Sequence, residues 1–187
     1  MCAVAAAGGE AELLGAESEG LSPVSEVLLR SGCRIEKTDR GIYLCRKGRL
    51  SSCGDPVRTG PHPCFPTDAQ PLVSSVMASA RGTTVFEENM FENRFAHMKE
   101  LSRMGAKIDL RGKYAVVEGV ERLSGRTVVS HDLRGGAALV VAGLGAQGET
   151  RILDAGYIDR GYENIEKTLT NLGADAERVR IEADKVE

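Results

Sequence analysis

Tryptophan is absent from this chain of 187 residues, and aromatic residues make up only 4% of it. Proteins that bind single-stranded nucleic acids stack bases on aromatic side chains, so such a platform is not expected here. An excess of basic residues is missing too, because the formal net charge is −3 and lysine and arginine are scattered along the chain. We therefore expect neither a nucleic-acid partner nor a helix that lies on a membrane surface.

Long hydrophobic runs are also missing. The longest one, residues 137–144, is far shorter than the ~20 residues that cross a bilayer. The apolar start, residues 1–7, has no preceding basic region and is interrupted by Gly8 and Gly9, unlike a secretory signal. The five cysteines form no Cys-x-x-Cys pair, and an odd number of scattered cysteines indicates reduced thiols. These absences predict a cytoplasmic protein.

What the chain does contain is an internal repeat. An apolar helical segment ends at a glycine, a short β-branched strand follows, and an amphipathic helix then ends at a second glycine before one or two further strands. The paired glycines are Gly9 with Gly32, Gly82 with Gly105, and Gly148 with Gly173, which lie 23, 23 and 25 residues apart. Self-similarity at a fixed period indicates a repeat architecture.

The order helix–strand–helix–strand–strand predicts an α/β fold of the α+β type rather than a helical solenoid. We expect one domain over residues 1–187, with repeats at roughly 1–54, 55–125 and 126–182. The closing strand of the third repeat is expected at residues 176–181. Strands at 55–59 and 126–129 precede the second and third repeats, whereas the first has no leading strand. The domain is therefore expected to be incomplete at its N-terminus.

The most distinctive segment is residues 58–70, which holds three of the six prolines. Proline fixes its own φ and pushes the preceding residue toward extended geometry, so this segment is expected to be a stiff loop. It ends at Thr67 and Asp68, just before an apolar run that reads as a helix. A carboxylate held by rigid backbone suits a general base, but the same pattern fits a plain helix cap. Both interpretations stay open at this point.

Three arginines are further candidates. Arg94 and Arg160 occupy equivalent positions before the amphipathic helices of consecutive repeats, and a cation is not the favoured charge at a helix N-terminus. Arg134 stands beside Gly135 and Gly136 at another helix start, where backbone N–H groups and a guanidinium can meet an anion. Convergent arginines with one rigid carboxylate indicate a small, multiply anionic substrate that carries a hydroxyl to be deprotonated.

Other kinds of site have weaker support. Cys64 lies two residues from His62, but a thiol nucleophile would need a second base and an oxyanion-binding loop, and neither is evident. A zinc site made from His62, Cys64, His97 and His131 does not have ligand spacing. The glycines after Arg134 do not form the Gly-x-Gly-x-x-Gly pattern of a dinucleotide fold. No metal and no cofactor are therefore expected.

Several motifs, taken together, resemble the UDP-N-acetylglucosamine 1-carboxyvinyltransferase family of enolpyruvyl transferases. They keep the family order over nearly the whole chain and occupy residues 58–60, 65–70, 91–95, 101–106, 132–134 and 158–163. The resemblance implies an inside-out α/β barrel of repeated units, with two such domains flanking a cleft. It also implies transfer of the enolpyruvyl group of phosphoenolpyruvate to the 3′-hydroxyl of UDP-N-acetylglucosamine, with release of phosphate, at the start of peptidoglycan synthesis.

Carried over residue by residue, the resemblance also implies substrate contacts. The backbone of Met90 would meet the nucleotide sugar. Arg134 and Arg160 would hold the phosphoenolpyruvate anion, and Arg94 would be another arginine of the active site. Asp68 would contact the reacting hydroxyl, which makes it the best candidate for the base.

Asp132 matches an acidic residue of the same site, which would transfer a proton or orient groups. The N-terminal part of the family pattern is missing, including a Lys-Asn pair and a mobile loop with a Cys or Asp proton donor; none of the five cysteines matches that donor. We therefore expect the chain to supply one domain, to need that portion as a partner and to be inactive alone. A non-catalytic binding or scaffold domain remains the alternative, with self-association as one way to cover an exposed apolar face.

Overall fold

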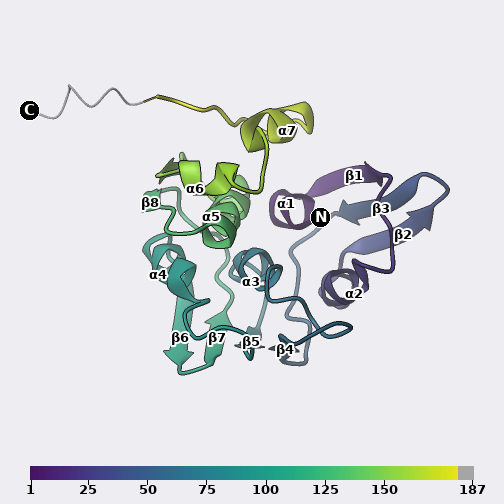
Figure 1. Ribbon diagram of the computed structural model, residues 1–187, viewed down its shortest axis with the longest axis horizontal. Helices are drawn as coiled ribbons and strands as arrows, with labels where there is room; N and C mark the ends of the chain where they lie inside the picture. Colours follow the sequence, from purple (N-terminus) through teal and green to yellow (C-terminus); the bar gives the residue numbers. More distant parts are fainter. Residues whose placement is uncertain (181–187) are drawn as a thin grey trace, which may run out of the picture.

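The computed structural model describes residues 1–180, which form three consecutive units of helices and strands (Figure 1). The first unit contains α1 (Cys2–Ala7), β1 (Gly9–Leu14), α2 (Ser22–Arg30), β2 (Arg34–Thr38) and β3 (Gly41–Arg46). The second contains β4 (Val57–Arg58), α3 (Gln70–Met77), β5 (Thr83–Glu87), α4 (Ala96–Arg103), β6 (Lys107–Arg111) and β7 (Tyr114–Glu118). The third contains β8 (Thr127–Val129), α5 (Leu133–Gly145), β9 (Arg151–Leu153), α6 (Gly156–Asp159) and α7 (Ile165–Asn171).

The sheets of the units share one topology. In the first sheet the order is β1-β3-β2, and the second sheet repeats it as β5-β7-β6, with all of these pairs antiparallel. The second sheet adds β4 in parallel beside β5, and β8 lies in parallel beside β9 in the same way. Even the flanking hydrogen bonds correspond, because Thr59 N donates to Glu87 O and Ser130 N donates to Leu153 O. The chain is therefore a mixed α/β structure with a visible internal repeat.

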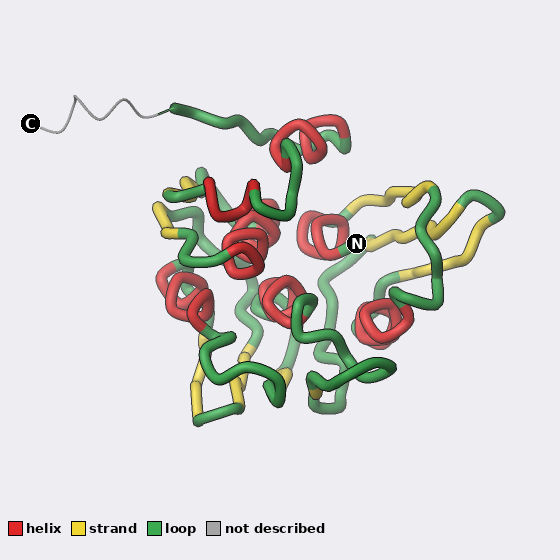
Figure 2. The backbone as a smooth tube through the Cα atoms, viewed as in Figure 1, coloured by secondary structure: helices red, strands yellow, loops and turns green. Residues whose placement is uncertain are grey.

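The core lies where the first helices of the three units meet. Helices α1, α3 and α5 pack against one another in the middle, and the strands lie outside them (Figure 2). The middle of α5 is completely apolar, and Ala138 and Leu139 are at most 1% exposed. A side chain at Gly145 would begin 2.7 Å from the carbonyl oxygen of Ala6, so this glycine permits α1 to approach α5 closely.

Two sequence-based expectations for the third unit need correction. The short helix α6 was not predicted. The strand expected at residues 176–181 is not formed over 176–180, and Ile181 lies outside the described residues, as does residue 182 of the expected repeat. The physical reason is that Arg178 binds Asp159 of α6 and Glu166 of α7, which directs this segment toward the helices rather than a sheet.

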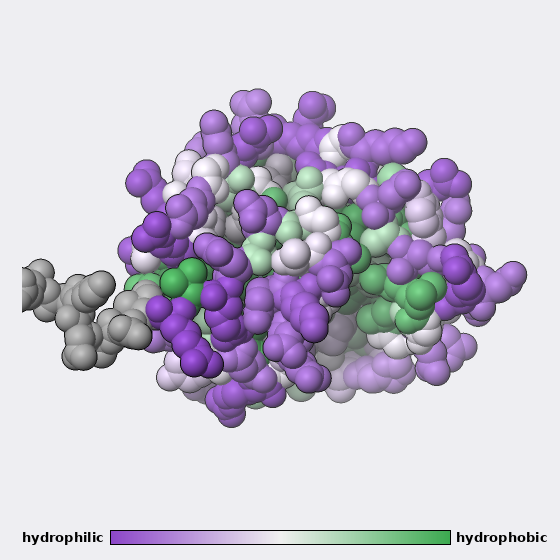
Figure 3. Space-filling model, turned by 90° about the horizontal axis from the view of Figure 1, so that it is seen from above, coloured by the Kyte–Doolittle hydropathy of each residue, from purple (hydrophilic) through white to green (hydrophobic). Residues whose placement is uncertain are grey.

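The surface is mainly polar. Seen from above, hydrophilic side chains dominate, and hydrophobic ones gather on the side of the first unit (Figure 3). Exposed apolar side chains of that unit include Leu14 and Leu29. Within residues 1–180, no helix has both the length and the apolar character needed to cross a bilayer. Cys64 is exposed, and the other four cysteines are buried.

Candidate active site

Asp68 is the centre of a charged cluster formed by three separate segments. Its Oδ1 accepts a hydrogen bond from Nη2 of Arg94 at 2.6 Å, and its Oδ2 accepts one from Nη2 of Arg134 at 3.0 Å. The arginines are largely covered, with side chains 16% and 28% exposed, whereas the Asp68 side chain is 55% exposed. The rigid loop before α3, the loop before α4 and the first turn of α5 thus converge on one accessible carboxylate.

These two arginines control the protonation of Asp68. Partial burial alone would raise the pKa of this carboxyl, but the hydrogen bonds and charges of Arg134 and Arg94 outweigh it and hold the pKa below its ordinary value. Asp68 is therefore ionised at neutral pH and is a hydrogen-bond acceptor. A group that drew one arginine away would raise this pKa and make the carboxylate a better base.

The interpretation of Asp68 as a helix cap is wrong. Helix α3 begins at Gln70, its N-cap residue is Ala69, and no side chain accepts a capping hydrogen bond there. Both carboxylate oxygens are instead used by the arginines. The loop is stiffened as expected, since Gly60 N donates to Phe65 O and a bridge joins Thr59 to Phe65.

The first turn of α5 is capped by Asp132. Its Oδ1 accepts from Gly135 N at 2.8 Å, and its backbone carbonyl accepts from Gly136 N. The expectation that these glycines present free N–H groups to an anion is therefore wrong. They are needed for close packing, because a Cβ at Gly136 would lie 2.2 Å from Oγ of Ser130.

Arg134 projects from the same turn of α5 toward the segment that follows α6. Its guanidinium lies 5.6 Å from the centre of the Tyr162 ring, a cation–π contact that sequence reasoning missed. Arg160, at the end of α6, is exposed, and its side chain makes no hydrogen bond or ion pair with any residue in the described part of the chain. The structure thus joins Arg134 to Asp68 but leaves Arg160 without an acidic partner.

Met90 lies in the loop between β5 and α4, and its side chain is 45% exposed. The next residue, Phe91, is also exposed, and the guanidinium of Arg94 lies 4.7 Å from the centre of its ring. This loop is fixed by the buried carboxylate of Glu88, which accepts from the backbone N–H groups of Met90 and Phe91.

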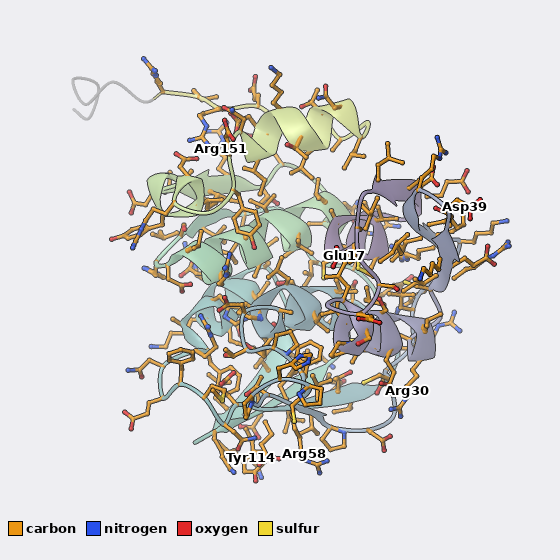
Figure 4. The ribbon with its side chains drawn as sticks, turned by 45° about the vertical axis from the view of Figure 1, so that its right-hand side comes forward. Glu17, Arg30, Asp39, Arg58, Tyr114 and Arg151 are labelled. Carbon is orange, nitrogen blue, oxygen red and sulfur yellow. The ribbon has the colours of Figure 1, made fainter. Side chains whose placement is uncertain are left out.

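Sequence reasoning missed Glu88, although the strand pattern contains a signal for it. Residues Thr84, Phe86 and Glu88 are all at most 3% exposed, so Glu88 continues the buried face of β5. Alternate residues of a strand share one face, and a carboxylate on the buried face needs partners. At one end of the same sheet, Arg58 of β4 and Tyr114 of β7 lie together (Figure 4), and both contact the carboxylate of Glu87.

A second polar group lies buried beneath the charged cluster. His97 of α4 is 2% exposed, and its Nε2 lies 2.9 Å from Oγ of Ser74 on α3. Burial lowers its pKa to about 4, although the charge of Asp132 and the carbonyl of Arg94 act in the opposite direction. His97 is therefore neutral at pH 7 and links two of the helices that carry the site.

No group of three or more His, Cys, Asp or Glu residues within residues 1–180 is placed to hold a metal ion. The cluster contains three charged groups, with the carboxylate of Asp68 in direct contact with both guanidinium groups. Such an arrangement can bind a small anion and accept a proton from a hydroxyl.

Comparisons with known proteins place the chain in a family. A family model described as EPSP synthase (3-phosphoshikimate 1-carboxyvinyltransferase) matches residues 1–169, so the chain belongs to this family of enolpyruvyl transferases. Within the family, it is similar to two UDP-N-acetylglucosamine 1-carboxyvinyltransferases, one from Chelativorans sp. (strain BNC1) and one from Brucella ovis. Each is 45% identical over 177 residues, which cover 95% of this chain and 41% of the relative. The chain thus spans less than half the length of these curated relatives.

Solved structures show the same fold. The enolpyruvyl transferase NikO from Streptomyces tendae superposes with a TM-score of 0.77 at 24% identity, over 94% of this chain and 42% of NikO. EPSP synthase from Acinetobacter baumannii superposes with a TM-score of 0.60 at 18% identity, over 81% of this chain and 37% of that enzyme. At these identities the superpositions support the fold alone.

Proposed function

We propose that this chain supplies one domain of an enzyme that transfers the enolpyruvyl group of phosphoenolpyruvate to the 3′-hydroxyl of UDP-N-acetylglucosamine and releases phosphate. The observation that carries the proposal is the contact of Asp68 with both Arg94 and Arg134, because it joins an ionised base candidate to cations that suit an anionic substrate. The names of the 45% identical relatives support the choice of substrates.

Arg134 and Arg160 bind the carboxylate and phosphate of phosphoenolpyruvate. Arg160 is available for this role because it has no acidic partner among the described residues. When the anion takes Arg134 away from Asp68, the carboxylate loses one of the two cations that lower its pKa. Its affinity for a proton then rises in the complex in which a substrate hydroxyl must be deprotonated.

Asp68 accepts the proton of the 3′-hydroxyl, and Arg94 keeps the carboxylate aimed at it. Met90 contacts the nucleotide sugar through its backbone, from a loop that Arg94 and Glu88 hold in place. Asp132 orients the first turn of α5, and therefore Arg134, and lies at the site as an acidic group for proton transfer.

The proposal extends to the architecture. The three units form most of an inside-out α/β barrel, in which apolar helices lie inside and sheets outside. A second such domain closes the cleft and contributes the proton donor. The chain alone binds substrates weakly and does not turn over, because one wall of the cleft and the general acid come from the remaining portion of the enzyme.

Nuclear magnetic resonance of the isolated chain tests the binding part of this proposal. Titration with phosphoenolpyruvate should shift the side-chain Nε–H signals of Arg134 and Arg160, and UDP-N-acetylglucosamine should shift the amide of Met90. The variant R151Q is a matched control, because Arg151 is exposed on β9 and, within residues 1–180, its side chain pairs only with Glu149. A scaffold without a binding role would show no saturable shift at any of the three positions, and that result would contradict the proposal.

A further inference from the structure

Glu88 is a buried acid that the proposed reaction does not use. It is 3% exposed and follows directly after β5, where its backbone N–H donates to Lys113 O at 2.8 Å. Burying a carboxylate is unfavourable unless hydrogen bonds satisfy its oxygens. The partners of the two oxygens therefore indicate what this residue does.

The two oxygens bind different segments. Oε1 accepts from Met90 N at 2.8 Å and from Phe91 N at 3.2 Å. Oε2 accepts from the hydroxyl of Thr67 at 3.0 Å, in the rigid loop that carries Asp68. One carboxylate thus joins the loop between β5 and α4, called here the Met90 loop, to the rigid loop before α3, called here the Asp68 loop.

The hydroxyl of Thr67 continues the connection to the active-site arginine. Oγ1 of Thr67 accepts from Nε of Arg94 at 3.1 Å, and the Nη2 of the same guanidinium binds Asp68. A hydroxyl has a single proton, and Thr67 donates it to Glu88. The donor-to-acceptor direction of these hydrogen bonds is therefore fixed. It runs from Arg94 to Thr67 and ends at the carboxylate of Glu88.

We propose that Glu88 is a positioning residue that fixes the side chain of Arg94 and the backbone of the Met90 loop in place relative to Asp68. Arg94 is held at two points, by Thr67 at Nε and by Asp68 at Nη2, so its guanidinium plane cannot turn without breaking a hydrogen bond. The same carboxylate holds the Met90 backbone, so the nucleotide-sugar contact and the base share one support. This role rests on the proposed function, but the geometry can be tested without substrate.

A carboxylate matches this set of donors on both sides. It accepts on both oxygens, whereas a glutamine accepts on one and donates from the other. In E88Q, an amide group turned toward Thr67 would donate to the hydroxyl oxygen, which would then accept from both the amide and Arg94, and the hydroxyl proton would lose its acceptor at position 88. An amide turned the other way would oppose the N–H groups of Met90 and Phe91. Either orientation removes the acceptor that Glu88 offers on one side, and so weakens one half of the support with almost no change in shape.

The test measures hydrogen exchange at Nε–H of Arg94 in the isolated chain by nuclear magnetic resonance. We expect exchange to become at least about tenfold faster in E88Q and in T67V, which lacks the hydroxyl. It should stay near the wild-type rate in T67S, which restores the hydroxyl, and in E92Q, which changes an exposed acid of the same loop. Unchanged exchange in both E88Q and T67V would overturn the proposal.

In a second experiment, the remaining portion of the enzyme is added to this chain as a separate chain, and phosphate release is measured. E88Q and T67V should lower kcat/KM by roughly 10- to 100-fold, with T67S close to wild type. Faster Arg94 exchange with unchanged kcat/KM would overturn the positioning role. A reconstituted wild type that releases no phosphate would contradict the proposed function instead, because the exchange experiment contains no substrate.

Discussion

Asp68 and Arg134 form an ion pair, with 3.0 Å between Oδ2 of Asp68 and Nη2 of Arg134. The two residues occupy equivalent positions of consecutive repeats. They are 66 residues apart, the same spacing that separates Gly82 from Gly148, and Arg94 is related to Arg160 in the same way. The second unit therefore contains an acid with its arginine, whereas the corresponding positions of the third unit hold two arginines. The three arginines together with Asp68 therefore carry a net positive charge, which an anionic ligand could neutralise.

Removal of the competing carboxylate should strengthen anion binding by the isolated chain. In D68N, Arg134 and Arg94 lose their internal anion, so the affinity for phosphoenolpyruvate should rise about 3- to 10-fold. Isothermal titration calorimetry measures this, and D39N, which removes an exposed negative charge from the turn between β2 and β3 of the first unit (Figure 4), is the control. Equal or weaker binding by D68N would show that the arginines do not form the anion site.

The buried His97 should make the chain sensitive to acid. The pKa of this imidazole is lowered to about 4 in the folded chain, from an ordinary value of 6.5. The unfolded chain takes up a proton between these values and the folded chain does not, so stability is lost as pH falls. The free energy of unfolding should decrease by up to about 3 kcal/mol from pH 6.5 to pH 4.

Urea unfolding at several pH values measures this effect. H97Q should lose most of the dependence in this window, whereas H131Q should keep it, because His131 is exposed. An H97Q profile parallel to that of the wild type would contradict the assignment of the neutral buried form.

Asp132 should have two separable roles. D132A removes the cap of α5 and should lower the free energy of unfolding by about 1 kcal/mol. D132S keeps a capping oxygen, so its stability should remain near that of the wild type, while activity of the reconstituted enzyme should fall in both variants. Full activity in D132S would restrict Asp132 to the capping role.

The two glycines that follow Arg134 should be intolerant of side chains. A Cβ in G136A would meet Oγ of Ser130 at 2.2 Å and Cγ1 of Ile158 at 2.7 Å, so the first turn of α5 must shift. We expect a loss of about 1–3 kcal/mol in the free energy of unfolding. G156A, at a position with no atom within 4 Å of the added Cβ, is the control and should change stability little.

The repeat could be predicted from the sequence because each unit carries its own local signals. Gly82 and Gly105 lie in the second unit at turns with φ of 89° and 95°, where glycine is favoured, and the short strand expected after Gly82 is formed as β5. The third unit was harder to predict. The position of its last segment depends on the ion pairs that Arg178 forms with Asp159 and Glu166. A sequence does not reveal which distant acids an arginine will pair with.

The site could be predicted only in part, for a related reason. Asp68, Arg94 and Arg134 were each visible as a residue in an unusual local setting, but the contact among them depends on how three loops converge. The same holds for the choice between a cap and a base at Asp68. The structure excludes the cap, because the arginines of two other segments bind the carboxylate, and the role of Asp68 as a base stays a prediction.

The most direct test of the central claim is phosphate release from phosphoenolpyruvate and UDP-N-acetylglucosamine. It is measured with this chain alone and with the remaining portion of a related enzyme supplied as a second chain. We expect no release from this chain alone, release upon complementation, and loss of that release with D68A but not with D39N. Release by the chain alone at the rate of a complete enzyme, or undiminished release with D68A, would contradict the proposed function.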